Sequence, residues 1–399
     1  MAEKLALDGG EPLAPEGIPY HRPSVGAAEA REIRKSLESR YIVGPGPYCE
    51  KVENHLEENW DTPRALTTTS CTHALELVLL ALDLPPDAEV IVPSFTYIST
   101  AQAVLRAGAR PVFAEVDLES FTLSAETVAE ASTPETAAVI FVHYGGFPGR
   151  IEEVQQLCAE KEICLIEDAA QAFDSSRAGK LAGTFGRFGA FSFHGTKSIT
   201  SGEGGLLLVN READIERCER IRDKGTDRSS RRLGDVDRYT WRTIGSSYVL
   251  SDVLGALLWR QIQRWPDIKK RRLSVQSEVR EKIREIDTEN LFKLFLPPEK
   301  TEENGHITAF TLKDPELRNW FLEALQAEGV EAREHYRPLH LSPYAQKNLD
   351  PPSSLPVAEH VSQSLVRMPA HPELSEIQID KQFAALEKVY SHLVSKSGL

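Results

Sequence analysis

The sequence has few cysteines and no paired cysteine motif. Its five cysteines are odd in number, are scattered along the chain and include no CxxC pair: Cys49, Cys71, Cys158, Cys164 and Cys218. We therefore expect neither a disulfide framework nor a cysteine-based metal site. The simplest expectation is a reduced, cytoplasmic protein with no bound metal.

The chain also lacks long apolar runs and an excess of positive charge. No stretch approaches the length of a membrane-spanning helix, and the first 12 residues lack the apolar core of a signal peptide. Acidic residues outnumber basic ones by 60 to 46, which gives a net charge of -14. This balance argues against a nucleic-acid surface, which needs clustered lysine and arginine. An anionic small substrate stays compatible, because a local pocket can be basic in an acidic protein.

The chain of 399 residues is long enough for about two domains, and 41% hydrophobic and 27% charged residues are ordinary for a globular enzyme. Continuous apolar runs predict buried strands at 90–93, 111–113, 138–142, 163–167, 191–193 and 205–209. Helical patterns at 72–82 and 151–161 lie between them. This alternation predicts an α/β domain with a mostly parallel sheet over residues 1–265.

The pattern changes near residue 265. We expect a smaller α+β domain over residues 266–399. Its expected elements are a long charged helix at 268–286, a strand at 306–312, helices at 315–328 and 379–394, and a loop at 350–355.

Two segments predict ligand contacts at element ends. Hydroxyl residues at 67–72 precede an apolar helix, and such a helix start can hold a phosphate group or can be an ordinary N-cap. Asp168 ends an apolar strand, where ligands bind in open α/β sheets. It could keep a pyridine nitrogen protonated, or it could be a solvated acid or a helix N-cap.

Two further segments complete the set. Lys197 follows a strand that contains Ser192 and precedes the glycine-rich run 202–205. A buried lysine there can form a Schiff base, although most lysines are solvated surface charges. Tyr97 follows another strand and can stack on a flat ring or pack in the core.

These segments resemble a known family. EDAAQA at 167–172, FSFHGTK at 191–197 and GEGG at 202–205 resemble the DegT/DnrJ/EryC1/StrS sugar aminotransferases, which are fold-type I pyridoxal-phosphate enzymes. The resemblance extends from YIVGPG at 41–46 to HYRPLH at 335–340. The SCT turn at 70–72 and the segments 222–228, 237–241 and 244–248 are most similar to the group that makes dTDP-4-amino-4,6-dideoxygalactose.

The resemblance implies a fold and a set of roles. The fold would be a large domain with a mostly parallel, seven-stranded type of sheet, followed by the smaller domain. Lys197 would hold pyridoxal 5'-phosphate covalently, Asp168 would face its pyridine nitrogen and Gln171 its ring hydroxyl. The remaining contacts implied are Tyr97 on the ring and Cys71, Thr72 and Ser192 at the phosphate.

The resemblance also implies a homodimer with shared active sites. Ser247 would reach the phosphate of the neighbouring subunit's cofactor. Many relatives carry a GxNxR pattern at this place, where this chain has Ser247 and Val249. The contact across the interface is therefore less firmly implied than the others.

Substrate contacts are expected in two regions. The basic loop residues Lys224, Arg228, Arg231 and Arg232 are candidates for a diphosphate, although such a loop can simply be solvated. His306, His335 and Tyr336 are candidates for the sugar or for the donor carboxylate. His335 and His340 could bind a metal by residue type alone, but the resemblance accounts for both without one.

The expected reaction transfers an amino group from L-glutamate to a dTDP-linked 4-keto-6-deoxy sugar, with Lys197 moving the proton. A 3-keto sugar nucleotide is an alternative acceptor. A sugar dehydratase is disfavoured, because those relatives replace the lysine with histidine. A non-catalytic cofactor-binding regulatory protein stays the alternative from another class.

Overall fold

The computed structural model describes residues 3–234 and 237–397, without the side chains of 231–233. Its centre is a seven-stranded sheet in the order β1-β9-β8-β5-β4-β2-β3. The strands are β1 (Arg64–Thr68), β2 (Glu89–Pro93), β3 (Arg110–Ala114), β4 (Thr136–Val142), β5 (Cys164–Asp168), β8 (Phe188–Ser192) and β9 (Gly205–Val209). β9 is antiparallel to β1 and β8, and the other neighbours are parallel. The predicted mostly parallel α/β sheet is confirmed.

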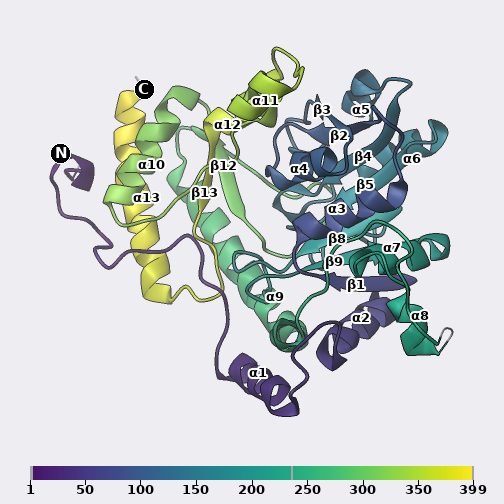
Figure 1. The fold of residues 1–399 in the computed structure, drawn as a ribbon. Helices are drawn as coiled ribbons and strands as arrows, with labels where there is room; N and C mark the ends of the chain where they lie inside the picture. Colours follow the sequence, from purple (N-terminus) through teal and green to yellow (C-terminus); the bar gives the residue numbers. More distant parts are fainter. Residues whose placement is uncertain (1–2, 235–236, 398–399) are drawn as a thin grey trace.

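Helices cover both faces of this sheet (Figure 1). One face packs against α3 (Cys71–Leu82), α4 (Ser99–Arg106) and α7 (Ile215–Arg222). The other face packs against α2 (Pro47–Trp60) and α9 near one edge, and against α5 (Ala125–Ala131) and α6 (Ile151–Glu160) further along. Coverage on both sides explains why the strands are continuous apolar runs. The remaining elements before α9 are α1 (Ala27–Ser39), β6 (Ser176–Arg177), β7 (Lys180–Leu181) and α8 (Arg228–Leu233).

The long helix α9 corrects the sequence-based prediction of its start. It extends from Asp252 to Ile286 and includes Pro266, whereas the prediction began near residue 268. Its first half buries Leu258, Ile262 and Trp265 against the sheet. Proline normally ends a helix, so the sequence did not indicate that one helix continues through Pro266. The predicted domain division at 265/266 falls inside one helix and stays a prediction.

The C-terminal part contains a three-stranded antiparallel sheet in the order β10-β12-β13. Its strands are β10 (Phe292–Leu294), β12 (Thr308–Leu312) and β13 (Leu365–Met368), and its main helices are α10 (Arg318–Ala327) and α13 (Glu376–Lys396). Also present are β11 (Thr301–Glu302), α11 (Pro343–Asn348) and α12 (Pro356–Ser364). The helices predicted at 315–328 and 379–394 correspond to α10 and α13, while β10 and β13 were not predicted.

The N-terminal segment packs with this C-terminal part, although the sequence-based division grouped it with the first domain. Leu5, Ala14 and Ile18 belong to the same buried cluster as Phe310. The carboxylate of Glu328 accepts hydrogen bonds from the backbone N–H groups of Ala6 and Leu13. The chain then crosses to α1, and the start of the chain lies beside α10 and α13 (Figure 1).

None of the helices within the described ranges has both the length and the apolar composition needed to cross a bilayer.

Candidate active site

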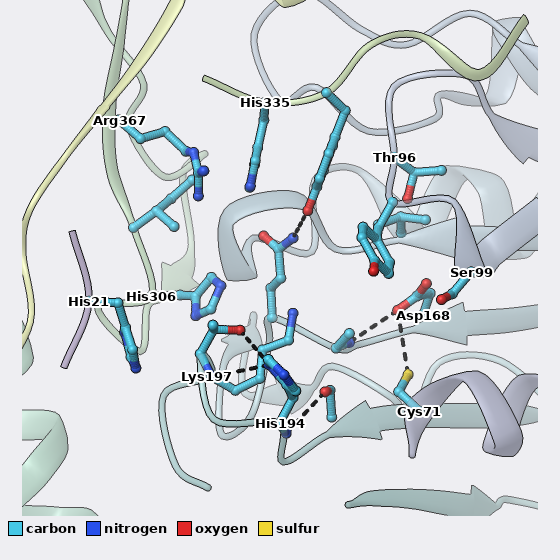
Figure 2. A pocket seen from close by; sticks show the side chains of 18 of the residues that line it. His21, Cys71, Thr96, Ser99, Asp168, His194, Lys197, His306, His335 and Arg367 are labelled. Atoms are coloured by element: carbon cyan, nitrogen blue, oxygen red, sulfur yellow. Dashed lines mark hydrogen bonds between the residues drawn. The ribbon is translucent and has the colours of Figure 1, made fainter. Parts of the chain in front are cut away.

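A cavity of about 520 Å³ opens at the carboxyl edge of the large sheet. Its lining comes from α3, from the ends of β2, β5 and β8, from the Lys197 loop and from the C-terminal sheet. Figure 2 shows Lys197 in the middle, with Asp168, Cys71 and Ser99 on one side and Arg367, His306 and His21 on the other. The cavity therefore lies where the two parts of the chain meet.

The start of α3 forms one end of the cavity. The Ser70 hydroxyl caps the helix by accepting from the His73 N–H at 3.1 Å, and Thr72 donates to the Ser99 hydroxyl at 2.8 Å. The first N–H groups of a helix have no acceptor inside it and favour an anion. Cys71 and Thr72 occupy these first positions. This end therefore fits a phosphate group.

Asp168 is the last residue of β5 and is almost fully buried, with 6% exposure. Its carboxylate accepts from the Thr100 hydroxyl at 2.9 Å, from the Ala170 N–H at 3.2 Å and from the Cys71 thiol at 3.8 Å. These donors fix its orientation at the edge of the cavity. The position suits a carboxylate that pairs with a protonated ring nitrogen.

Lys197 lies in the turn between β8 and β9, where its N–H donates to the His194 carbonyl at 2.9 Å. Burial lowers the pKa of Lys197, and Arg367 lowers it further, while Cys71 and Asp168 oppose the shift. A lowered pKa increases the fraction of neutral amine. Such an amine can attack an aldehyde to form a Schiff base.

Gln171 and Tyr336 also line the cavity. The Gln171 side chain accepts from the Gly145 N–H at 2.8 Å and donates to the Tyr336 hydroxyl at 3.3 Å. Tyr336 stacks on His335 with ring centroids 3.8 Å apart. Burial lowers the pKa of His335 well below its usual value, so this ring is neutral at pH 7. The two stacked rings therefore form a flat, uncharged wall of the cavity.

Three further predicted residues lie at the cavity. Tyr97 is 57% exposed, and its ring lies 6.1 Å from that of Tyr336. Ser192 accepts from the His194 N–H at 3.3 Å. His306 pairs with the Ser198 hydroxyl at 3.1 Å, and burial lowers its pKa well below the usual value. The described chain therefore brings most predicted cofactor and sugar contacts together, although their roles stay predictions.

Of the predicted contacts whose side chains the structure describes, Lys224, Arg228 and Ser247 do not line this cavity within one chain. Ser247 is exposed and pairs through its backbone with Asp223. Lys224 and Arg228 are also exposed and lie 2.7 and 3.7 Å from the Asp223 carboxylate. The side chains of Arg231 and Arg232 lie outside the described part of the structure. A role for Ser247 requires a second subunit.

The sequence-based reasoning missed a group of residues from the N-terminal segment, α9 and the C-terminal sheet. Those that line the cavity include Tyr20, His21, Arg272, Arg367 and His371. One signal was available, since Arg367 interrupts the apolar run Leu365–Met368 that forms β13. The others have no local motif.

Known proteins resemble this chain along most of its length. The model of the DegT/DnrJ/EryC1/StrS aminotransferase family matches residues 23–387. The chain is 30% identical over 383 residues to the GDP-perosamine synthase of Escherichia coli O157:H7, covering 94% of this chain and 99% of that protein. It is 29% identical over 393 residues to the dTDP-4-dehydro-2,3,6-trideoxy-D-glucose 4-aminotransferase of Saccharopolyspora spinosa, covering 95% and 98%.

Solved structures show the same fold. The aminotransferase TlmJ from Streptoalloteichus hindustanus superposes with a TM-score of 0.87 at 27% identity, over 94% of this chain and all of that one. DesV of S. venezuelae, solved with a ketimine intermediate, gives a TM-score of 0.82 at 28% identity, over 91% of this chain and 94% of that one. Both similarities extend through the sheet and the C-terminal part.

Proposed function

Because this chain belongs to the DegT/DnrJ/EryC1/StrS aminotransferase family, we propose that it transfers the amino group of L-glutamate to a nucleotide-linked 4-keto-6-deoxy sugar. The family consists of pyridoxal-phosphate-dependent sugar aminotransferases, and this protein is such an enzyme. The observation that carries the proposal is the placement of Lys197 between Asp168 and the C-terminal wall of one cavity.

The bound cofactor supplies an electron sink that stabilises negative charge at the carbon carrying the amine. Asp168 would pair with the protonated ring nitrogen, and three donors hold its carboxylate in place at the cavity. The start of α3 would hold the phosphate, together with Ser192. Gln171 would contact the ring hydroxyl, and Tyr97 would contact the ring.

Lys197 has two duties in this proposal. Its amine would hold the cofactor, and the same amine would carry the proton that leaves the substrate carbon. Burial favours its neutral form, which can accept that proton. His306 and His335 are neutral for the same reason and lie where they can contact the sugar or the donor.

The choice of a 4-keto sugar is supported by the relative whose name gives a 4-aminotransferase acting on a dTDP-4-dehydro sugar. The relatives include proteins named for GDP-linked and for dTDP-linked sugars. We propose a dTDP-linked sugar because the segments 222–228, 237–241 and 244–248 resemble the group that acts on dTDP sugars. A 3-keto sugar nucleotide is the alternative acceptor, and a regulatory protein that binds the cofactor without turnover is the alternative role.

We further propose a homodimer in which Ser247, Lys224 and Arg228 reach the neighbouring subunit's cavity. Their exposure in the single chain supports this arrangement. The same surface region exposes the large apolar side chains of Trp241 and Ile244, at 79% and 73%. We also propose a cytoplasmic location, which the five free cysteines support.

The test begins with the visible spectrum of the purified enzyme. Glutamate alone should change the cofactor absorbance of the wild type, whereas a regulatory protein would show no change. Lys197→Ala should lose that response and lower turnover by about 10³-fold or more, because it removes the proton carrier. Lys161→Ala, at an exposed lysine after α6, is the matched control and should behave as the wild type.

The acceptor is identified with glutamate and a panel of 3-keto and 4-keto sugars linked to dTDP, UDP and GDP. Product NMR should show the new amine at C4 of a dTDP sugar. Turnover limited to 3-keto sugars would contradict the proposed acceptor. Near wild-type turnover by Lys197→Ala would contradict the assignment of the lysine.

A further inference from the structure

Asn304 is a fully buried side chain of the C-terminal part, between β11 and β12, with 0% exposure. Its amide nitrogen donates to the carbonyls of Gln171 at 2.9 Å and Phe173 at 3.0 Å. Its amide oxygen accepts from the His306 N–H at 3.0 Å. A carbonyl can only accept and an N–H can only donate, so these partners fix which way the amide points. Asn304 therefore joins the turn after β5 to the turn before β12.

The turn that carries Asn304 is anchored at the cavity. Its third residue, His306, lines the cavity on the side of Lys197 opposite Asp168 (Figure 2). Arg272 on α9 donates to the backbone carbonyl of His306 at 3.0 Å. Because α9 holds this turn, the Asn304 amide reaches the large sheet from a fixed point.

The Gln171 side chain has a defined orientation as well. The Gly145 N–H donates to its amide oxygen at 2.8 Å, so its amide nitrogen is the end that meets the Tyr336 hydroxyl at the cavity, at 3.3 Å. Gln171 therefore offers N–H donors, not an acceptor, to a ligand. A donor at the ring oxygen of the cofactor stabilises negative charge there. It thus lowers the pH at which the bound cofactor loses a proton.

The backbone around the bond between Asn304 and Gln171 is tightly packed. Gly146 has a φ of +88°, and a Cβ there would lie 2.8 Å from the Asn304 amide oxygen and 2.8 Å from the Gln171 carbonyl oxygen. Gln171 itself is 7% exposed. Loss of the Asn304 amide would take the donor away from this buried carbonyl, which is costly, so the turn after β5 would shift.

We propose that Asn304 is a positioning residue for the cofactor: its amide holds the turn after β5 so that Gln171 donates to the cofactor ring oxygen. The two residues are 133 positions apart in the chain. This inference rests on the proposed contact of Gln171 with the ring, and it adds the residue of the C-terminal part that fixes that contact.

The test follows the visible absorbance of the cofactor-loaded enzyme as a function of pH. Gln171→Ala should raise the midpoint of this titration by about 0.5 in pH or more, because a hydrogen-bond donor is lost. Asn304→Ala should raise the midpoint in the same direction by a smaller amount. In the Gln171→Ala background, Asn304→Ala should give no further rise, because no amide is left to orient.

Asn210→Ala is the matched control. The Asn210 amide nitrogen also donates to two backbone carbonyls, those of Gly183 at 2.8 Å and Gly186 at 2.9 Å, and its oxygen accepts from the Thr62 hydroxyl at 3.0 Å. It follows the end of β9 that is away from the Lys197 loop. Urea unfolding should show a loss of stability in both alanine variants. The midpoint of the absorbance titration should move only for the variant at the cavity.

The outcomes separate this inference from the proposed ring contact. An unchanged midpoint in Asn304→Ala, with a raised midpoint in Gln171→Ala, would overturn the inference alone. An undiminished rise in the double variant would also overturn it, and so would an equal rise in Asn210→Ala. An unchanged midpoint in Gln171→Ala would refute the ring contact together with the inference.

A second variant covers the case in which Asn304→Ala does not fold. Asn304→Ser keeps a small hydroxyl in place of the amide, and it should raise the midpoint less than Gln171→Ala does. An unchanged midpoint in the serine variant would then overturn the inference. The titration needs no acceptor, so failure of every 4-keto sugar would refute the proposed acceptor and leave this result standing.

Discussion

Replacing Gly205 with alanine places a methyl group where the structure has no room for one. Gly205 begins β9 and lies against the turn that starts α3. A Cβ at this position would lie 2.3 Å from the carbonyl carbon of Ser70 and 2.5 Å from the nitrogen of Cys71. Both are backbone atoms, so no side-chain rotation can relieve the overlap. Restoring the shortest contact to 3.4 Å requires the strand and the helix start to separate by about 1 Å.

The tight packing of β9 makes this separation costly in the free energy of unfolding. All residues of β9 are buried, and the strand is paired on both sides with β1 and β8. Overpacking in such a place costs about 1–3 kcal/mol in the free energy of unfolding. The displaced helix start should also hold an anion less well, by about 1 kcal/mol or roughly fivefold in Kd.

Two measurements check this reasoning. Urea unfolding of the enzyme without cofactor gives the loss of stability, and titration with pyridoxal phosphate gives the change in Kd. Gly26→Ala is the control, because a Cβ there would have no neighbour within 4 Å and its φ is extended. If Gly205→Ala matches the wild type in both unfolding and cofactor affinity, the strand and the helix start accommodate the methyl group without cost, contrary to this prediction.

Two further predictions concern pH and assembly. Burial lowers the pKa of His371 to about 4 from 6.5. The unfolded chain therefore binds a proton at this residue before the folded protein does as the pH falls. Between pH 7 and pH 5 this difference should lower the free energy of unfolding by about 2 kcal/mol. His371→Asn should therefore flatten the dependence of the unfolding free energy on pH, and an unchanged slope in denaturant titrations would contradict this. Sedimentation velocity should give a dimer, as the exposed Trp241 and Ile244 suggest; a monomer at micromolar concentration would refute the shared-site arrangement.

Much of the fold and of the candidate site could be predicted from local sequence motifs. The strands before Asp168 and Lys197 are continuous apolar runs bounded by polar residues, so their ends could be predicted from the sequence. The carboxyl edges of such strands lie together in an α/β sheet. The structure places Asp168 and Lys197 at the same cavity for that reason.

Other features could not be predicted from neighbouring residues. The start of α9 was missed because Pro266 and the charged run after it resembled a boundary, whereas the buried face formed by Leu258 and Ile262 depends on packing against the sheet. The packing of Leu5 and Ile18 against the C-terminal cluster joins segments that are distant along the chain. Hydrophobic periodicity reflects local structure only, so it cannot predict contacts between distant segments.

The groups proposed to act near Lys197 could be predicted from the sequence, because hydroxyl, carboxylate and amine side chains follow strands or begin helices in a fixed order. The charge of the opposite wall, in contrast, follows from how distant segments pack together. Arg272 and Arg367 come from a helix and a strand far from Lys197 in the chain, and an isolated arginine in a sequence is usually a surface charge. Folding buries both beside His306 without a carboxylate among the described residues, and that burial makes them candidates for binding an anion.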